Sequence, residues 1–217
     1  LEPKLSYLSH SSQAIPLIQF GVFDGPSSLN LENSSYSISS FVSDWDETRY
    51  KEAFDQVLAY IEAGDIYQAN LTFSLFADFE GDPWTFYKDL QLKQKVKHGA
   101  FVDLDSEISI LSRSPELFFK TDSEMNISTR PMKGTQPRDL DAEKDKQNLK
   151  FLKNDIKNRA ENLMIVDLLR NDISRISKVG TVKVPELYRV ETYETVHQMT
   201  SLIIGEMNKK TTITELF

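Results

Sequence analysis

Apolar and polar residues follow two different rhythms along the chain, and each rhythm predicts one kind of element. Between residues 46 and 65 the large apolar side chains recur every three or four positions, and Gly64 follows as a C-cap, so this segment is predicted to be an amphipathic helix. A second helix is predicted over residues 82–96. Residues 68–80, between the two, alternate well enough to predict a strand.

Short runs rich in β-branched and aromatic residues fill the middle of the chain. Turn residues separate them, which predicts antiparallel strands connected as a meander. The runs occupy residues 99–104, 107–112, 116–121 and 124–129. In residues 1–45, short apolar pieces lie between Ser, Asn and Pro, and this pattern predicts further strands joined by turns.

A long helix is predicted over residues 141–172. Its first half is charged, and Leu149, Leu152 and Ile156 form the stripe that should be buried. Residues 163–169 are apolar around nearly the whole circumference. Because a helix that is apolar on all sides is normally covered on all sides, this turn is expected to be fully buried.

The last part of the chain returns to strand patterns over residues 179–190 and 201–207, while residues 195–201 fit a short helix or a turn. No internal repeat or low-complexity linker interrupts the sequence. A single α+β domain over residues 1–217 is therefore preferred to two separate domains.

Composition removes several classes of function. The 217 residues contain 25 Lys and Arg against 33 Asp and Glu, a net charge of −8, so nucleic acid and anionic lipid are unlikely partners on charge grounds. The absence of cysteine excludes disulfides, thiolate metal sites and thiol nucleophiles. No apolar run is long enough to span a bilayer and no signal region is visible, which predicts a soluble, cytoplasmic protein. Three scattered histidines leave a hard ion such as Mg2+, held by carboxylates, as the metal to expect.

Both ends of the sequence suggest a fragment. The first residue is Leu1, so this is not a native translation start. Thr212 and Glu215 have the spacing of a capping box, yet the sequence stops within the turn that they would open. The expectation is a fold truncated at its C-terminus.

Glu161 stands at the start of the apolar turn of the long helix. A carboxylate that enters a buried helix must be paired, protonated or bound to a metal. An internal ion pair with Arg159 or Arg170 and a metal site are both open, and composition alone favours the ion pair.

Three further residues could carry chemistry, and each has a simpler structural explanation. Glu116 follows a Ser-Pro pair at the head of an apolar strand, where a carboxyl can act as a general acid, although turn-flanking glutamates are common. His197 is a single histidine, which is more often a hydrogen-bonded structural residue. Lys133 lies between two arginines that would lower its pKa and make it a nucleophile, or it lies in an exposed turn. Spacing alone does not choose between these alternatives.

Five motifs occur together in an order and spacing that resembles the chorismate-utilising enzymes. The resemblance covers roughly residues 45 to 205, and it is specific because the five motifs occur jointly. The motifs are "AGDIYQANLT", "SRSPELFF", "TRPMKGTQPR", "KNRAENLMIVDLLRND" and "VPELYRVETYETVHQMTS".

This resemblance implies an α+β fold in which two antiparallel sheets pack as a sandwich with helices outside, and a site that binds chorismate with Mg2+. It implies that Glu161 is a magnesium ligand and that Glu116 is the general acid that protonates the departing C4 hydroxyl. It also places His197 and Thr135 beside the substrate. Gln198 departs mildly from the histidine that the family often has at this point.

Lys133 and Gln68 distinguish between branches of the family. Anthranilate and isochorismate synthases usually have alanine at the position of Lys133, whereas lysine marks the branch that aminates chorismate at C4 for para-aminobenzoate and folate synthesis. Gln68 replaces a lysine base of the relatives that add water, and an amide cannot act as that base. The implied reaction joins the Lys133 amine to C2, then replaces it by ammonia at C4, with the ammonia supplied by a glutamine amidotransferase subunit or domain.

Two rival functions remain. The chain could be an anthranilate synthase component I, which Lys133 disfavours. It could also be a non-catalytic regulatory relative that keeps only a binding pocket, which the retained Glu116, Lys133 and Glu161 disfavour. The family continues well beyond residue 217, so the chain alone is expected to have little or no activity.

Overall fold

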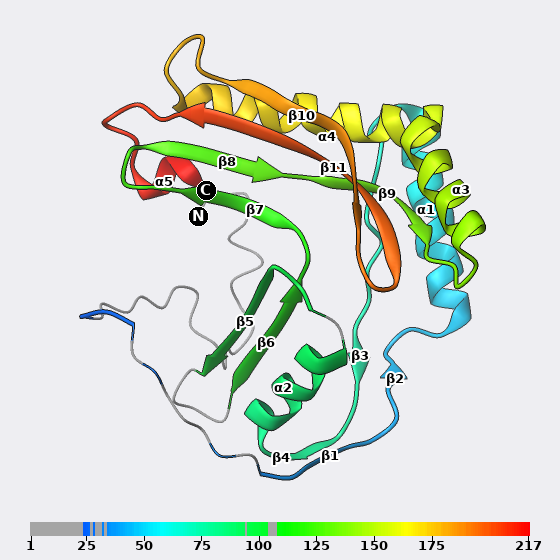
Figure 1. Cartoon of the computed structure of the whole chain (residues 1–217). Helices are drawn as coiled ribbons and strands as arrows, with labels where there is room; N and C mark the ends of the chain where they lie inside the picture. The colour runs from blue at the N-terminus through cyan, green and yellow to red at the C-terminus, as the bar shows by residue number, and fades with distance from the viewer. Residues whose placement is uncertain (1–23, 27, 29–31, 33, 94, 104–107) are drawn as a thin grey trace. The chain divides into compact units, whose positions relative to one another are not determined.

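The computed structural model describes residues 24–26, 28, 32, 34–93, 95–103 and 108–217 (Figure 1). The chain divides into two compact units. The first comprises Leu1–Leu90 and Phe101–Ser109, and the second comprises Gln91–Ala100 and Ile110–Phe217. The strands predicted within residues 1–23 lie outside the described residues.

Unit 1 contains the first predicted helix, and its ends are confirmed. Helix α1 spans Glu47–Ala63, begins where the Asp46 side chain accepts a hydrogen bond from the N–H of Arg49, and ends at Gly64 in the left-handed region with φ of 79°. The helix forms because an N-cap carboxylate and a C-cap glycine satisfy the unpaired backbone groups at its two ends.

The strand predicted over residues 68–80 is shorter than expected and is split in two. Strand β3 (Leu75–Phe76) pairs with β2 (Val42–Ser43), and β4 (Phe79–Gly81) pairs with β1 (Tyr36–Ile38). The segment is interrupted because its two halves have different partners. Helix α2 (Pro83–Lys93) follows, as predicted, and its Tyr87 is buried against Trp84 and Phe101.

Unit 2 is built on a five-stranded antiparallel sheet. Its strand order is β10-β11-β8-β7, and β9 also pairs with β11. The bounds of these strands are β7 Leu117–Thr121, β8 Asn126–Arg130, β9 Met132–Pro137, β10 Lys183–Thr192 and β11 Val196–Glu206. A separate two-stranded sheet is formed by β5 (His98–Asp103) and β6 (Ser109–Ser114).

The mixed α+β class is thus confirmed, with antiparallel sheets and with helices packed on the five-stranded sheet.

Strands β8 and β9 follow one another along the same partner. The second half of β11 pairs with β8 and its first half pairs with β9. Pro131 separates the two, since proline has no N–H for a ladder, but its carbonyl still accepts a hydrogen bond from the N–H of Ser201 at 3.2 Å. Residues 195–201, expected as a short helix or turn, therefore lie mainly in β11, and this prediction was wrong. The cause is the pairing with β9, which local sequence does not reveal.

The long predicted helix consists of two helices, α3 (Ala142–Asn154) and α4 (Ile156–Ile176). Asp155 ends the first and caps the second by accepting a hydrogen bond from the N–H of Asn158 at 2.8 Å. Leu152 is fully buried as predicted, whereas Ile156 is exposed because it begins the new helix.

One face of α4 packs on the sheet, and the core of unit 2 lies in that contact. The buried cluster consists of Ile127, Val166, Ile173, Ile203 and Met207. The opposite face of the same helix is open among the described residues, with Leu163 47% and Leu168 45% exposed. The expectation that residues 163–169 are buried on all sides was therefore wrong.

A short helix, α5 (Ile213–Leu216), follows the sheet. The Glu215 carboxylate accepts hydrogen bonds from the backbone N–H and the hydroxyl of Thr212, as the capping spacing predicts. Among the residues that the structure describes, no helix is both long and apolar enough to cross a membrane.

Candidate functional site

Lys133 lies in a bulge of strand β9. Thr135 pairs with Gln198 and Met132 pairs with Thr200, so two residues of β9, Lys133 and Gly134, oppose the single Met199 of β11. A bulge of this kind bends the strand and changes the direction of the side chains in it. Within the described residues, the Lys133 ammonium forms no ion pair.

Gly134 is required at the second position of this bulge for two reasons. Its φ is +92°, a conformation that residues with a side chain rarely adopt. A Cβ added there would lie 2.9 Å from Oδ1 of Asn158, at the start of α4. Asn158 cannot easily move away, because its side chain also donates a hydrogen bond to Asp155 at 2.8 Å. The bulge and the first turn of α4 are thus in direct contact.

Glu116 is attached to the same strand through the backbone. Its Oε1 accepts a hydrogen bond from the N–H of Met132 at 2.9 Å, so the carboxylate lies next to the residue that precedes Lys133. Ser114 supports the turn that carries it, since the N–H of Glu116 donates to the Ser114 hydroxyl at 3.3 Å. The side chain of Glu116 remains exposed.

A shallow hollow of ≈ 350 Å³ opens beside Glu116. Its lining is Ser114, Glu116, Leu117, Phe118, Thr129, Pro131, Ile165 and Leu169. The hollow therefore joins the head of β7, the end of β8 and the half-buried side of α4 that carries Ile165 and Leu169. A carboxyl group at the edge of such a largely apolar hollow is a reasonable proton donor to a bound molecule.

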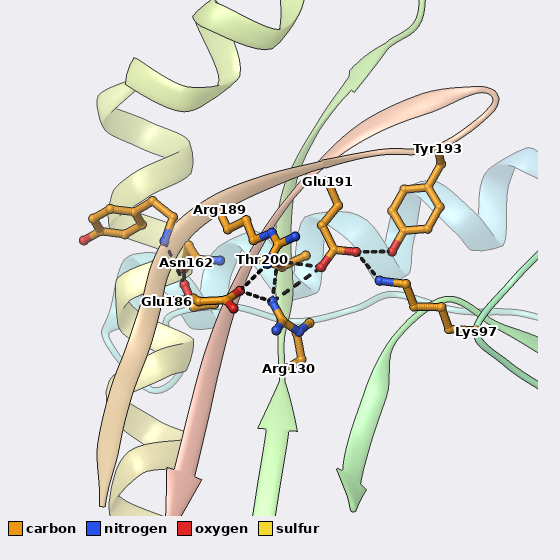
Figure 2. A network of polar contacts seen from close by, with 10 residues as sticks. Lys97, Arg130, Asn162, Glu186, Arg189, Glu191, Tyr193 and Thr200 are labelled. Carbon is orange, nitrogen blue, oxygen red and sulfur yellow. Dashed lines mark hydrogen bonds and ion pairs between the residues drawn. The ribbon is translucent and has the colours of Figure 1, made fainter.

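Arg130, which precedes Pro131, is held in a network of charges between β8, β10 and β11 (Figure 2). Its Nη1 donates to Glu186 at 2.8 Å and lies 3.4 Å from both Glu191 and Thr200. Lys97 contacts Glu191 from the other side at 2.6 Å. Figure 2 shows the guanidinium between the two carboxylates. The network fixes the strand end from which the Lys133 segment continues.

The electrostatics of this network follow from its burial and its partners. Burial alone would raise the pKa of Glu191, but hydrogen bonds from Lys97 and Tyr193 and the charge of Arg130 together lower it. Burial, followed by the hydrogen bond to Glu191, raises the pKa of Tyr193 to about 12. Arg130 and Arg189 lower the pKa of Glu186 through hydrogen bonds. Both glutamates therefore stay ionised at neutral pH.

Glu161 lies one turn after Asn158 on α4, and its side chain is 39% exposed. Its nearest cation is Lys157, at 3.9 Å, which is a weak pair on an exposed surface. The ion pairs with Arg159 or Arg170 that the sequence allowed are not formed: Arg159 stacks on the Tyr188 ring and Arg170 pairs with Asp167. The Glu161 carboxylate is thus available to a ligand.

The described residues fit a magnesium ion only in part. Among them, no group of three or more His, Asp or Glu side chains could enclose a metal. Glu161 offers one hard oxygen ligand, and Mg2+ is often held by one or two carboxylates together with water and substrate oxygens. Glu161 is therefore a possible single ligand from this part of the chain.

His197 occupies different surroundings from the other predicted site residues. It is 1% exposed, its Nε2 lies 2.9 Å from Oδ1 of Asp145 on α3, and its Nδ1 lies 3.0 Å from the Thr192 hydroxyl. Asp145 also accepts hydrogen bonds from Arg138 and from the N–H of Asp139. The Arg138 hydrogen bond in particular holds the pKa of Asp145 well below its usual range.

The structure brings together four of the predicted residues in unit 2 and leaves two apart. Lys133 and Thr135 share β9, and Glu116 is bonded to that strand. Glu161 lies on α4, one turn after Asn158, the residue that contacts Gly134 of β9. His197 faces α3 instead. Gln68 belongs to unit 1, where its Oε1 is buried without a hydrogen-bond partner among the described residues.

Sequence reasoning missed the contacts through which Arg130, Asp145 and Asn158 organise the site. Arg130 and Asn158 stand inside the quoted motifs, next to the residues that were singled out. Their partners are distant in sequence, from 24 positions for the Asn158 side chain and Gly134 to more than 50 for Arg130 and Glu186. No local sequence pattern predicts a contact between residues that far apart.

A comparison with known protein families gives the class to which this chain belongs. Residues 7–217 match the family described as chorismate binding enzyme. The chain belongs to this family.

Its similar relatives narrow the class. The aminodeoxychorismate synthase component 1 of Salmonella typhimurium is 42% identical over 178 residues, which are 82% of this chain and 39% of the relative. The anthranilate synthase component 1 of Saccharolobus solfataricus is 36% identical over 173 residues, 78% of this chain and 41% of the relative. The chain spans about two fifths of the length of each of these two curated relatives.

A solved structure has the same fold. The crystal structure of anthranilate synthase component I from Streptococcus pneumoniae TIGR4 superposes with a TM-score of 0.72 at 27% identity, over 86% of this chain and 40% of that one. The fold expectation drawn from the sequence resemblance is thereby confirmed.

Proposed function

We propose that this chain is part of an aminodeoxychorismate synthase component 1, the enzyme that aminates chorismate at C4 to give 4-amino-4-deoxychorismate. Three relatives of that name are 42–44% identical to it, whereas two anthranilate synthase component 1 relatives are 36–37% identical. The observation that carries the proposal is the position of Lys133. It stands in a strand bulge, beside a carboxylate that is bonded to the preceding residue, and it has no ion-pair partner among the described residues.

Lys133 is the proposed nucleophile. Its neutral amine forms a bond to C2 of chorismate, both ring double bonds shift by one position, and the C4 hydroxyl leaves as water. Ammonia then forms a bond to C4, both double bonds shift back, and the C2–N bond breaks to return the lysine amine. No carboxylate among the described residues pairs with the Lys133 amine, which leaves it for a substrate and favours this role.

Glu116 is the proposed proton donor for the leaving hydroxyl. One of its oxygens is held by the Met132 N–H, which leaves the second oxygen for the proton. Glu116→Gln should slow the overall reaction by about 10²–10⁴-fold, the usual contribution of a general acid, because the amide cannot release a proton. Circular dichroism spectra that match those of the parent would show that the loss is chemical.

Glu161 is the proposed ligand of a Mg2+ ion. A divalent ion at this position would neutralise negative charge on the bound substrate. Glu161 itself contributes one carboxylate oxygen and is oriented by the packing of its helix, which Asn162 fixes by accepting a hydrogen bond from the buried Ser201 at 2.6 Å. Thr135 and Gln68 are proposed as substrate neighbours.

The proposal implies a partner and a location. Component 1 relatives are named as one part of an assembly, and the ammonia would come from a glutamine amidotransferase subunit or domain. Chorismate is the proposed substrate, and a cytoplasmic location follows from the metabolic role. No nucleic acid or membrane is part of this proposal.

The test is mass spectrometry of the products that the full-length protein forms from chorismate, ammonium and Mg2+. The parent should form aminodeoxychorismate, and Lys133→Ala should abolish it. Lys120→Ala, which changes an exposed lysine on β7, is the matched control and should stay active.

Two results would contradict the proposal. Anthranilate and pyruvate as products would move the chain to the anthranilate branch, with which it also shares its fold. Aminodeoxychorismate formed equally well by Lys133→Ala would show that Lys133 is not the nucleophile.

A further inference from the structure

Glu191 lies in the same row of the sheet as Thr135, a proposed neighbour of the substrate. Gln198 of β11 pairs with Thr135 of β9 on one side and with Glu191 of β10 on the other. Residues that are paired across antiparallel strands share a face, so the side chains of Thr135 and Glu191 are on the same face. Two strand spacings separate their backbones by about 10 Å. Glu186, further along β10, is joined to this position through Arg130.

Two carboxylates on this face act against the proposed substrate. Chorismate carries two carboxylates itself, and hydrogen bonds from cations lower the pKa of Glu186 and help to lower that of Glu191, so both stay ionised at neutral pH. Charges separated by about 10 Å on a protein surface still interact, because the Debye length is about 8 Å at physiological ionic strength. Unless they are neutralised, the two glutamates would therefore weaken the binding of a dianion.

Arg130 is the cation that contacts both glutamates. Its Nη1 lies 2.8 Å from Glu186 and 3.4 Å from Glu191, and Figure 2 shows the guanidinium between them. Lys97 pairs with Glu191 and Arg189 pairs with Glu186, so the five groups together carry a net charge of +1. The side chain of Arg130 is 19% exposed, against 57% for Lys97 and 56% for Arg189. The charge of Arg130 is therefore the least screened by water.

We propose that Arg130 determines the affinity for an anionic substrate by neutralising Glu186 and Glu191, so that the face that carries Thr135 presents a small positive charge to a dianion. This inference rests on the proposed function, since the anion is chorismate. Arg130 acts through its charge and needs no contact with the substrate. Its role is thus distinct from that of Lys133, which forms a bond to the substrate.

Arg130→Gln in the full-length protein tests the inference. The amide keeps a hydrogen-bond donor but removes the charge, so the net charge of the group falls by one unit. The KM for chorismate should rise about three- to tenfold at low ionic strength, with a smaller change in kcat, and NaCl at about 0.5 M should reduce the difference. Arg175→Gln is the matched control. It makes the same charge change at an exposed position of α4, which packs on the opposite face of the sheet, and should leave KM unchanged.

Two further variants separate charge from geometry. Arg130→Lys keeps the charge but loses the planar guanidinium, so KM should stay close to that of the parent even where the melting temperature falls. Arg130→Gln combined with Glu186→Gln restores the net charge of the group. Its KM should return towards the parent value, although this double variant has lost one more hydrogen-bonding carboxylate. A purely structural role predicts the reverse, with the double variant the poorest enzyme of the set.

Each remaining outcome contradicts a different statement. An unchanged KM in Arg130→Gln would overturn the inference, and so would a rise that neither NaCl nor the second substitution reduces. An equal rise in Arg130→Lys would show that geometry, and not charge, is what Arg130 supplies. Anthranilate in place of aminodeoxychorismate would overturn the proposed function alone, because chorismate is the substrate of both reactions. A parent protein that converts no chorismate would overturn both.

Discussion

Gly134 shows how a single residue can determine the geometry of a candidate site. Lys133 could be singled out from the sequence because arginines and a Gly-Thr pair surround it. The bulge could not, because it arises from the pairing with β11, and the register of two strands more than 60 residues apart is a property of the folded chain. The sequence therefore predicted the reactive group, while its surroundings became visible only in the structure.

Gly134→Ala should destabilise the protein more than Gly180→Ala. Both glycines have a positive φ, +92° and +80°, so each alanine suffers the backbone strain of about 1–2 kcal/mol. A Cβ at Gly180 meets nothing within 4 Å, whereas a Cβ at Gly134 lies 2.9 Å from Asn158. Urea unfolding of both variants gives the difference, which is the cost of the contact. An equal loss of unfolding free energy in the two variants would show that Asn158 and α4 move away from the added Cβ at no cost.

Helix α3 is joined to the β10–β11 hairpin by one carboxylate. Asp145 accepts from Arg138 at 2.8 Å and from His197 at 2.9 Å, and Arg138 also donates to the carbonyl of Tyr193 at the hairpin turn. The helix pattern of this stretch was predictable, as was the buried Leu152. The break between the two helices at Asp155 was not predictable, because no glycine or proline marks it. The contacts of Asp145 with His197 and of Arg138 with Tyr193 were not predictable either, because these partners are far apart in sequence.

Asp145→Asn should lower the melting temperature at neutral pH by several degrees, and the loss should depend on pH. The folded-state pKa of Asp145 lies below its ordinary value of 3.8, chiefly because of the Arg138 hydrogen bond. Ionised Asp145 therefore stabilises the folded protein at every pH above that ordinary pKa value. This contribution disappears as the pH falls through the lower pKa of the folded state. The difference in melting temperature between parent and variant should be constant from pH 7 to about pH 4 and shrink below it.

Thermal unfolding followed by circular dichroism across this range provides the measurement, and Asp172→Asn, at an exposed position of α4, is the control. A difference that shrinks already between pH 7 and pH 5 would exclude Asp145 as its source.

At the scale of the molecule, the two units differ in how much they bury. Unit 2 contains the cluster around Ile203, whereas Tyr87 is the buried apolar side chain in the described part of unit 1. The apolar face of α1, with Tyr50, Phe54 and Leu58, is 41–43% exposed. The helical period of α1 was readable from the sequence, yet period alone does not say what covers an apolar face.

Hydrogen exchange should accordingly separate the two units. Amides of β8, β11 and the middle of α4 should exchange most slowly, because opening them requires disruption of the core, and amides of α1 should exchange faster by orders of magnitude. Mass spectrometry of peptic fragments resolves these segments. Equally slow exchange in α1 would mean that its apolar face is covered in solution.

The residues around Lys133 are held by their own neighbours: the Met132 N–H donates to Glu116, Gly134 packs against Asn158, and the Thr135 hydroxyl donates to Gln198. None of these contacts uses the Lys133 side chain. The backbone of this part of β9 and the Lys133 side chain are consequently independent of each other. A change of one codon could replace the side chain at this position while the strand keeps its path. Such a site gives evolution a way to alter the chemistry of an old scaffold without first having to rebuild it.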